Sequence, residues 1–441
     1  MEGNLALSIV GLIVAIAVLM WLAYKGWNII IYSALSTVII CLFCGINVWD
    51  GLKNSWAAGT GTYVATWLML FAEGSIFGKI YQETGAATSI ADFLAKIFGE
   101  KNPVIPILIA SYLLTMSGIS SFVLIFCVYP IAIQLFAKAN ISKRLLPAVF
   151  CYAVWTVATV SPGSAQAPNL IPMAALGTSA MAGAIPGFAF AIIVAVINSL
   201  YITYHAKKLT AAGIVFEDKD ILVSGDHDNL PHVALAVIPI AVIILSFNLF
   251  HFTAEAALFL GIVLSMVIFW KRLDVKHWIS AWSEGAESSV MVLVNTAVIV
   301  GFGAVVLRTP VYDAALNWVS NTRINPYLLA AIAANVFSLI LGSATSSINL
   351  TMQTLGNVFL EYGAQGYSVG FMHRILAQAA MGLDTLPHSG ALLAVFNVCG
   401  TNHKEAYKYV CFCTVICPVA VSFLIQVPLC MLLTKLGIGM M

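Results

Sequence analysis

Long apolar runs separated by short polar breaks dominate the chain, and they define the helices that it predicts. A helix needs about 20 mainly apolar residues to cross the hydrocarbon core of a bilayer. Runs of that kind recur from one end of the sequence to the other with few charges inside them. The predicted membrane-spanning helices lie near residues 5–24, 28–46, 58–80, 145–160, 182–204, 232–250, 254–270, 286–307, 374–398 and 409–434.

Two further apolar runs, 103–136 and 326–360, are each interrupted by a polar tip. The first tip is Ser117-Gly-Ile-Ser-Ser121, and the second is Gly342-Ser-Ala-Thr-Ser-Ser347. Each run is long enough for two short helices that meet at the tip. We therefore predict two re-entrant helical hairpins, which enter the membrane from opposite faces.

Two predicted helices, 145–178 and 374–398, contain stretches that favour leaving the helical conformation. The second stretch, Asp384–Gly390, combines a carboxylate, an imidazole and two hydroxyls with Pro387, which has no backbone donor. Irregular backbone at membrane depth is tolerated only where protein buries it or where it lines a wet cavity. We predict two broken helices, interrupted at Ser161–Asn169 and at Asp384–Gly390. A simple proline kink is the structural alternative.

The second half of the chain repeats the order of features in the first. At an offset of about 225 residues, Pro162 aligns with Pro387 and Ser164 with Ser389, and the polar tips fall near each other. Five crossings in each half would invert the second half relative to the first. Inverted repeats with discontinuous helices are typical of secondary transporters. The predicted fold is an all-α polytopic membrane protein with repeats at 1–204 and 232–441, joined by a polar linker at 205–231.

The composition supports the membrane assignment. Hydrophobic residues make up 61% of the 441 residues and charged residues 9%, against about 25% charged in soluble domains. A net charge of +1 without a dense basic cluster gives no indication of nucleic-acid binding. The nine scattered cysteines are interpreted as small apolar side chains rather than as disulfides or metal ligands. The start of the chain lacks the basic region of a cleavable signal, so residues 5–24 are expected to form the first transmembrane helix.

The distribution of basic residues predicts the orientation in the membrane. Cytoplasmic loops carry an excess of Lys and Arg. With both termini outside, the cytoplasmic side receives most of the basic residues, and the linker is cytoplasmic. The outer side then receives Lys53, Arg308, Arg323, Arg374 and Lys435, with Lys79 undecided.

The two tips and the two breaks are expected to converge on one binding site. Orphan N–H groups at helix starts and the positive end of the helix dipole attract anions. Serine and threonine hydroxyls add donors without a permanent charge, so the site suits a small carboxylate. The alternative is that these hydroxyls bond back to their own helices or pack between helices.

Two residues of the second break are candidates for coupling to an ion. His388 is the candidate for a titrating group because imidazole changes charge near neutral pH. Asp384 is a candidate proton acceptor, cation ligand or helix cap, and a Na⁺ ion would be expected near Gly118, Gly342 and Asp384. Glu73 is an intramembrane carboxylate with either a functional or a structural role. Arg374 is interpreted as an interfacial anchor in preference to a substrate contact.

Three motifs resemble the gluconate permease family, in particular its hydroxybutyrate-permease-like branch. They are Gly382-Leu-Asp-Thr-Leu-Pro-His-Ser-Gly-Ala-Leu-Leu393, Thr401-Asn-His-Lys-Glu-Ala-Tyr407 and Gly78-Lys-Ile-Tyr-Gln-Glu-Thr-Gly-Ala-Ala87. The chain lacks the Asp-Ser-Gly-Phe-Trp motif of the sugar-acid branch, and it has Ser389 where the hydroxybutyrate-like branch usually has Asn.

The resemblance implies membership of the ion transporter superfamily. It therefore implies a scaffold domain, a moving transport domain, a homodimer and elevator-type alternating access. In this superfamily the binding residues lie at two hairpin tips and two broken helices. Together with Gln166 and Asn169 from the first break, the candidate substrate-binding residues are Ser120, Ser121, Ser161, Gly163, Ser164, Gln166, Asn169, Thr345, Ser346, Ser347, Thr385, His388 and Ser389.

We therefore expect a secondary transporter of a bacterial inner membrane, not an enzyme, and no cofactor. Its expected substrate is a small organic anion, a short hydroxy-monocarboxylate such as 3-hydroxybutyrate, taken up with H⁺ or Na⁺. One alternative is a cation/proton antiporter that uses Asp384 and Glu73. Another is a membrane-embedded hydrolase with Ser389 or Ser164 as nucleophile, which would need a positioned base. Nucleotide-driven pumping is not expected because the chain has no Gly-x-x-x-x-Gly-Lys-Ser/Thr loop.

Overall fold

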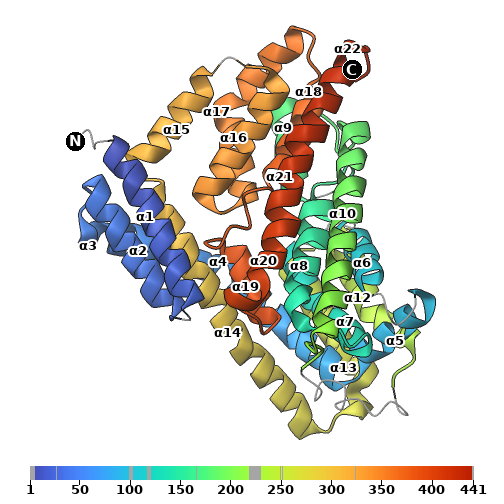
Figure 1. Ribbon diagram of the computed structural model, residues 1–441. Coiled ribbons are helices and arrows are strands. Elements are labelled where there is room, and N and C mark those ends of the chain that lie inside the picture. Colours follow the sequence, from blue (N-terminus) through green and yellow to red (C-terminus); the bar gives the residue numbers. More distant parts are fainter. Residues whose placement is uncertain are drawn as a thin grey trace.

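The computed structural model describes residues 5–25, 27–98, 103–116, 121–164, 166–217, 230–248, 250, 252–322 and 324–439. Within these ranges the chain is helical and contains no β-strand (Figure 1). The apolar runs therefore form helices, as the all-α prediction requires. The helices up to the linker are α1 (Leu5–Tyr24), α2 (Ile29–Cys44), α3 (Val48–Asp50), η1 (Gly51–Ala57), α4 (Ala58–Glu83), α5 (Ala86–Phe98), α6 (Val104–Met116), α7 (Ser121–Lys138), η2 (Lys143–Leu145), α8 (Leu146–Phe150), η3 (Cys151–Thr159), α9 (Ala167–Leu176) and α10 (Ala184–Ala211).

The part of the chain after the linker is built in the same way. Of the predicted linker at 205–231, residues 205–211 belong to α10, and residues 218–229 lie outside the described residues. The helices that follow it are α12 (Val233–Asn248), α13 (Ala254–Phe269), η5 (Trp270–Arg272), α14 (Val275–Val306), α15 (Pro310–Asn321), α16 (Pro326–Leu341), α17 (Ala344–Ala364), α18 (Val369–Ala379), α19 (Gly390–Val398), α20 (His403–Val410), η6 (Cys411–Ile416), α21 (Cys417–Val421), η7 (Ser422–Gln426) and α22 (Val427–Lys435).

Several helices have the length and apolar character of membrane spans. Four helical segments in the described part of the chain are long and apolar enough to cross a bilayer: Leu5–Leu22, Ala184–Ala211, Val275–Val306 and His403–Lys435. Shorter apolar helices, including α2 and α16, accompany them. Hydropathy did not predict α5 and α15. Both are amphipathic, and α5 places Asp92 in an ion pair with Lys138 of α7.

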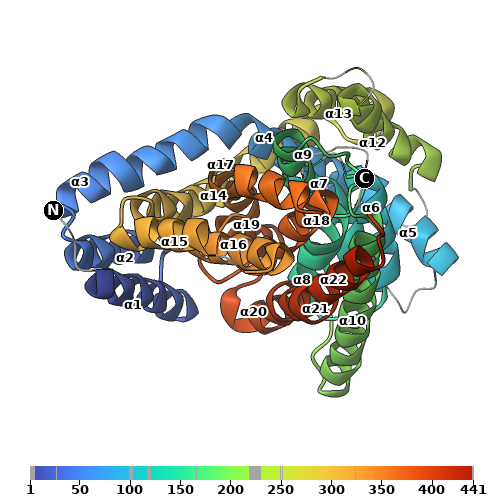
Figure 2. The same ribbon diagram turned by 90° about the horizontal axis from the view of Figure 1, so that it is seen from above.

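Helices from distant parts of the sequence surround a central group. Figure 2 shows α16, α17, α18 and α19 in the middle of the molecule, with α1 and α2 on one side and α10 on the other. The central helices pack on α9, α14 and η7. This arrangement brings the second predicted hairpin and both predicted breaks to the middle of the fold.

The long helices α4 and α14 pack closely because small residues lie between them. A Cβ atom at Gly285 would lie 2.7 Å from the Cα of Ile76, and one at Gly301 would lie 2.3 Å from the carbonyl oxygen of Trp56. Small residues of this kind let helix backbones approach each other in membranes. Lys79 of α4 forms an ion pair with Glu284 of α14 at 2.9 Å, and Arg308, just after α14, contacts Asp50 of α3 and Ser55 of η1 at 2.7 Å each.

Substitution at one of these glycines should separate the two helices. Gly301→Ala is expected to destabilise the protein by about 1–3 kcal/mol, because its methyl group forces packed backbone apart. Gly61→Ala in α4 is the control, since no atom lies within 4 Å of the added Cβ. Thermal unfolding of both purified variants checks the prediction. Equal stability of the two variants would contradict the close packing.

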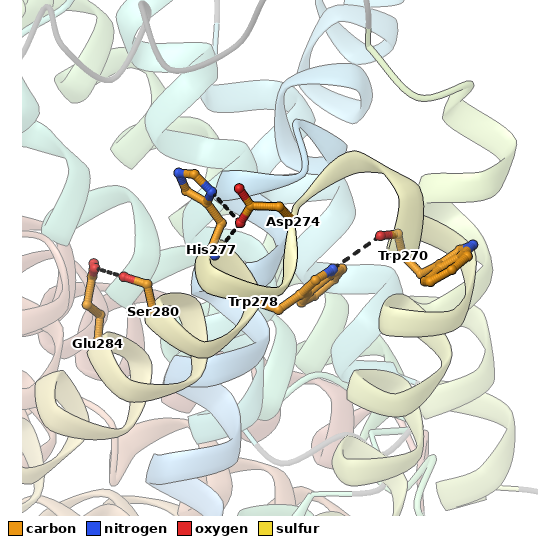
Figure 3. Close-up of polar contacts among 6 residues, drawn as sticks. All are labelled: Trp270, Asp274, His277, Trp278, Ser280 and Glu284. Atoms are coloured by element: carbon orange, nitrogen blue, oxygen red, sulfur yellow. Dashed lines mark hydrogen bonds and ion pairs between the residues drawn. The ribbon is translucent and has the colours of Figure 1, made fainter.

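The first turn of α14 begins outside the predicted span and is stabilised by side-chain contacts (Figure 3). Asp274 caps the helix by accepting a hydrogen bond of 2.8 Å from the backbone N–H of His277. This bond and a second from the imidazole hold the pKa of Asp274 below its ordinary value. The indole of Trp278 donates to the carbonyl of Trp270. The helix therefore begins at Val275, well before the predicted start at 286.

Candidate functional site

The tip of the second hairpin is an ordered turn between α16 and α17. Gly342 ends α16 with a positive φ of 59°, a conformation that favours glycine. Ser343 then caps α17 by accepting a hydrogen bond from the backbone N–H of Ser346. The hydroxyl of Ser347 donates to the carbonyl of Ala334 at 2.7 Å and ties the two helices together. The predicted pair of helices is confirmed, and its tip presents the start of a 21-residue helix.

The second break separates α18 from α19. Residues 380–389 leave the helix, and several contacts replace the lost backbone hydrogen bonds. Ser338 donates to the carbonyl of Ala380 at 2.7 Å, and an imidazole nitrogen of His403 lies 3.1 Å from the carbonyl oxygen of Pro387. The predicted broken helix over 374–398 is therefore present, with irregular backbone that protein encloses.

The second break and the second tip contact each other directly. The Nε2 atom of His388 lies 3.0 Å from the carbonyl oxygen of Leu339. A carbonyl only accepts, so this nitrogen carries the proton and Nδ1 has a free lone pair when the ring is neutral. The Asp384 carboxylate accepts a hydrogen bond from the backbone N–H of Ala344, in the first turn of α17. A Cβ atom at Gly342 would lie 3.2 Å from the His388 ring, so the tip and the ring pack closely.

The first break separates η3 from α9. η3 is a stretch of π-helix, a form that often occurs at functional sites. Residues 160–164 and 166 lie outside the helices, and α9 begins at Ala167 with Pro168 in its first turn. Asn169 donates to the carbonyl of Ser164 at 2.7 Å, and its side-chain oxygen accepts from His373 at 2.9 Å. Gly163 has a positive φ of 85° and donates to the carbonyl of Ala180.

A cavity of about 730 Å³ lies where the second tip and the two breaks face α4 and α14. Its volume is in the range of small-molecule sites, about 300–1,000 Å³. The central side of its wall comes from the tip and the breaks, and the opposite side is mainly apolar and aromatic. The lining includes Gly342, Thr345 and Ser346 at the tip; Met381, Asp384 and His388 in the second break; Thr159 and Gln166 at the first break; and Tyr63, Trp67, Leu70, Phe302 and Glu255 on the opposite side.

Three helix N-termini reach this cavity. Its lining includes Ala344–Ser346 at the start of α17, Ala167 and Pro168 at the start of α9, and Gly390 and Ala391 at the start of α19. A helix start offers unsatisfied N–H groups and carries about half a positive charge. The three starts together therefore favour a negatively charged group in the cavity.

Several buried polar atoms in and beside the cavity lack a hydrogen-bond partner among the described residues. In the cavity wall these include Oδ1 of Asp384, Nδ1 of His388 and the hydroxyl of Thr159. The hydroxyls of Ser164 and Ser389, one in each break, also have no partner. Leaving such a group unsatisfied costs about 1–3 kcal/mol. The atoms in the cavity wall therefore offer donors and acceptors to a polar ligand, whereas Ser164 and Ser389 are not among the residues that line the cavity.

The structure assigns other contacts to several predicted site residues. Ser161 donates to the carbonyl of Val157 in the preceding helix η3, and Ser347 donates to Ala334. The hydroxyls of Thr385 and Thr414 lie 2.5 Å apart. These three residues and Asn169 support the breaks and the tip, and the cavity lining does not include them. Gly118 and Ser120 lie outside the described residues, and Ser121 is described only as the first residue of α7.

The interpretation of Arg374 as an interfacial anchor is wrong. Its side chain is fully buried (0% exposed), and its guanidinium donates to three backbone carbonyls beside the first break. Hydropathy placed it at the end of a span because that span was expected to begin at 374. The helix begins at Val369 instead, so Arg374 lies within its buried part. Glu73 is buried in α4, and its Oε2 atom has no hydrogen-bond partner among the described atoms.

The sequence pattern does not indicate the opposite wall of the cavity. Tyr63 and Trp67 of α4 line it, as does Glu255 in the first turn of α13. The hydroxyl of Tyr63 is buried and has no hydrogen-bond partner in the described part of the chain. A signal was present, because Tyr63, Trp67 and Leu70 recur at helical spacing. Aromatic and apolar residues at this spacing in a span more often face lipid or other helices, and nothing local distinguishes the cases.

The cysteine side chains lie mainly in the interior of the protein. Of the eight cysteines described as free, seven are buried. No group of three or more His, Cys, Asp or Glu residues that could hold a metal occurs in the described ranges.

Known proteins similar to this chain are transporters. The chain is 25% identical to "Uncharacterized transporter YxjC" of Bacillus subtilis over 470 aligned positions, which cover 96% of this chain and 98% of the relative. It is 23% identical to an "Uncharacterized transporter" of Haemophilus influenzae, with 79% of this chain and 81% of the relative covered. It is also 24% identical to "Gluconate permease" of Zymomonas mobilis, over 66% of this chain and 69% of the relative. Residues 7–420 match the family described as GntP family permease. This match spans nearly the whole chain, which therefore belongs to the GntP family of membrane permeases.

Proposed function

We propose that this permease is a symporter that carries a small organic anion together with H⁺ or Na⁺. The observation that carries the proposal is the convergence of three helix N-termini, α9, α17 and α19, on one cavity. A carboxylate there would accept hydrogen bonds from backbone N–H groups and from hydroxyls. No arginine is among the described residues that line the cavity, so the site combines attraction with reversible release.

The lining of the cavity favours a short hydroxy-acid. Apolar side chains such as Leu70 and Met381 would contact a short carbon chain. Thr345 and Ser346 line the cavity and supply hydroxyls for a substrate hydroxyl group. A short hydroxy-monocarboxylate such as 3-hydroxybutyrate fits this chemistry. Gluconate is the second candidate, because one relative is named as a gluconate permease.

The coupling ion is proposed to act at the second break. Asp384 lines the same cavity as the anion, and two negative charges about 4 Å apart repel by about 4 kcal/mol at an effective dielectric constant of 20. Neutralising Asp384 with a proton or Na⁺ removes this repulsion. Protonation of His388 at Nδ1 would add a donor for the carboxylate. Either event raises the affinity for the anion, and the anion in turn raises the affinity for the ion.

The movement is proposed to be of the elevator type. In this proposal the hairpins at 103–136 and 326–360 and the broken helices at 145–178 and 374–398 form the transport domain. The α4–α14 pair belongs to the scaffold, so the cavity would lie between scaffold and transport domain. The two halves, 1–204 and 232–441, would be inverted repeats in a homodimer of the bacterial inner membrane, with both termini outside and the 205–231 linker in the cytoplasm.

Loss of either unpartnered serine hydroxyl should weaken substrate binding. Ser164→Ala and Ser389→Ala are each expected to reduce the affinity for the organic anion by about 1–3 kcal/mol, the scale of a buried hydrogen bond to charge. Ser265→Ala is the matched control, because its buried hydroxyl bonds only to its own helix. The substrate is first identified by screening organic acids for thermal stabilisation, with and without Na⁺. Wild-type affinity in both variants would contradict a substrate role for the breaks.

A cation/proton antiporter is the second candidate, favoured by the unpartnered carboxylate oxygens of Asp384 and Glu73. The screen separates the two functions, because an antiporter responds to cations and shows no stabilisation by organic anions. The hydrolase alternative receives no support, since within the described ranges neither Ser164 nor Ser389 forms a hydrogen bond with a base.

A further inference from the structure

The side chain of Arg374 is fully buried beside the first break. It forms no ion pair with a carboxylate in the described part of the chain. Its Nε atom donates to the carbonyl of Ala182 at 2.9 Å, Nη1 to Val160 at 2.8 Å and Nη2 to Ala180 at 2.9 Å. All three partners are backbone carbonyl oxygens. A buried ionised group is costly unless its surroundings compensate the charge, so the carbonyls must provide that compensation.

The position of these carbonyls explains how they do so. Val160 directly follows the last residue of η3, where backbone carbonyls lack helical partners and the helix dipole is negative. The Ala180 oxygen also accepts from the backbone N–H of Gly163 and the side chain of Asn169. Carbonyl oxygens at the unwound end of a half-helix are ligands that transporters use for small cations. The three oxygens around the guanidinium thus have the chemistry of a cation site.

The surrounding backbone is shaped to admit this side chain. A Cβ atom at Gly183 would lie 2.6 Å from the Cβ of Arg374, and one at Gly187 would lie 2.7 Å from its Cδ. Gly183 also has a positive φ of 61°. Gly183 directly precedes α10, and Gly187 lies in the first turn of that helix. Both glycines therefore leave room for the side chain of Arg374 between α10 and α18.

We propose that the Arg374 guanidinium is a permanent cation in a monovalent-cation site formed by the carbonyls of Val160, Ala180 and Ala182. Because the occupant is covalently attached, the first break needs no dissociable ion for its stability. The co-ion then binds only at the second break, near Asp384. This last clause rests on the proposed function, whereas the assignment of the site does not.

The test is restoration of an emptied site by small cations. Full-length Arg374→Ala protein is purified, and its unfolding temperature is measured in chloride salts of choline, Na⁺, K⁺ and guanidinium at equal, non-denaturing ionic strength. The variant is expected to unfold several degrees below wild type in choline. Guanidinium or an alkali cation is expected to restore part of the loss and to raise the unfolding temperature more than in wild type. Arg308→Ala, which removes an exposed arginine, should show no such cation-specific gain.

Two conservative variants keep the test decisive if Arg374→Ala does not fold. Arg374→Lys preserves the charge, and Arg374→Gln preserves hydrogen-bond donors without it. The lysine variant is expected to be the more stable by several degrees. Equal stability of the two, or a response of Arg374→Ala that is the same in choline as in the other salts, would overturn the proposal. The assay uses no substrate, so its failure would leave the transport function standing, and failure of transport would leave the cation site standing.

Discussion

His388→Gln is expected to abolish accumulation of substrate against a concentration gradient, while downhill counterflow persists at least in part. The glutamine amide can donate to the carbonyl of Leu339, as Nε2 of His388 does. It therefore preserves the contact between the second break and the second tip. It cannot take up a proton in the physiological range, so it removes the charge that Nδ1 would present to the anion. A coupling free energy of about 1–3 kcal/mol, or about 5–150-fold in affinity, should be lost.

Proteoliposomes under an imposed proton gradient provide the measurement. Wild-type protein should concentrate the organic anion, and the ratio of inner to outer substrate in the His388→Gln variant should fall to about one. His403→Gln is the matched control, because His403 is also buried and contacts a carbonyl but does not line the cavity. If His388→Gln protein still concentrates substrate on a proton gradient alone, the histidine is not the coupling group.

The second hairpin tip and the two breaks could be predicted because their signals are local. Pro387 and Gly390 interrupt an otherwise apolar run, and Gly342 takes the left-handed conformation that glycine favours. A hydropathy pattern therefore reveals the second tip and both breaks, and all three reach the cavity.

Long-range contacts decided what the sequence did not reveal. The hydroxyls of Ser161, Ser347 and Thr385 have hydrogen-bond partners. The hydroxyls of Ser164 and Ser389, which belong to the same polar clusters, have none among the described residues. Composition cannot separate a hydroxyl that bonds to a carbonyl from one left unsatisfied. The prediction for Arg374 was wrong for a related reason. Its carbonyl partners lie about 190 to 215 residues away in the sequence.

The opposite wall of the cavity depends on how helices pack. Tyr63 and Trp67 reach the cavity because α4 packs on α14 through glycines, an arrangement that the pattern of a single helix does not specify. The amphipathic helices α5 and α15 were missed because their polar faces break the apolar runs that hydropathy detects.

Asp384→Asn should make anion binding independent of the co-ion that neutralises this carboxyl. One oxygen of Asp384 accepts from the backbone of Ala344, and Oδ1 has no partner among the described residues. Asparagine has nearly the same shape and can accept the same hydrogen bond, but it is neutral at every pH. It should therefore bind the anion without first taking up an ion. If Na⁺ is the co-ion, the variant should lose the gain in affinity that Na⁺ gives wild type, whereas His388→Gln should retain it.

The measurement is the affinity of purified protein for the organic anion, in Na⁺ or choline chloride and at acid or alkaline pH. If a proton on Asp384 is the co-ion, the affinity of wild-type protein should fall at alkaline pH and should not depend on Na⁺. The Asp384→Asn variant should then lose this fall in affinity at alkaline pH. Glu73→Gln is the matched control, because it neutralises another buried carboxyl that does not line the cavity. That control should respond to both ions as wild type does. An Asp384→Asn variant with the full wild-type dependence on Na⁺ and pH would show that the co-ion acts elsewhere. Asp384 would then serve only to hold the start of α17, since its bond to the Ala344 N–H needs no exchangeable ion.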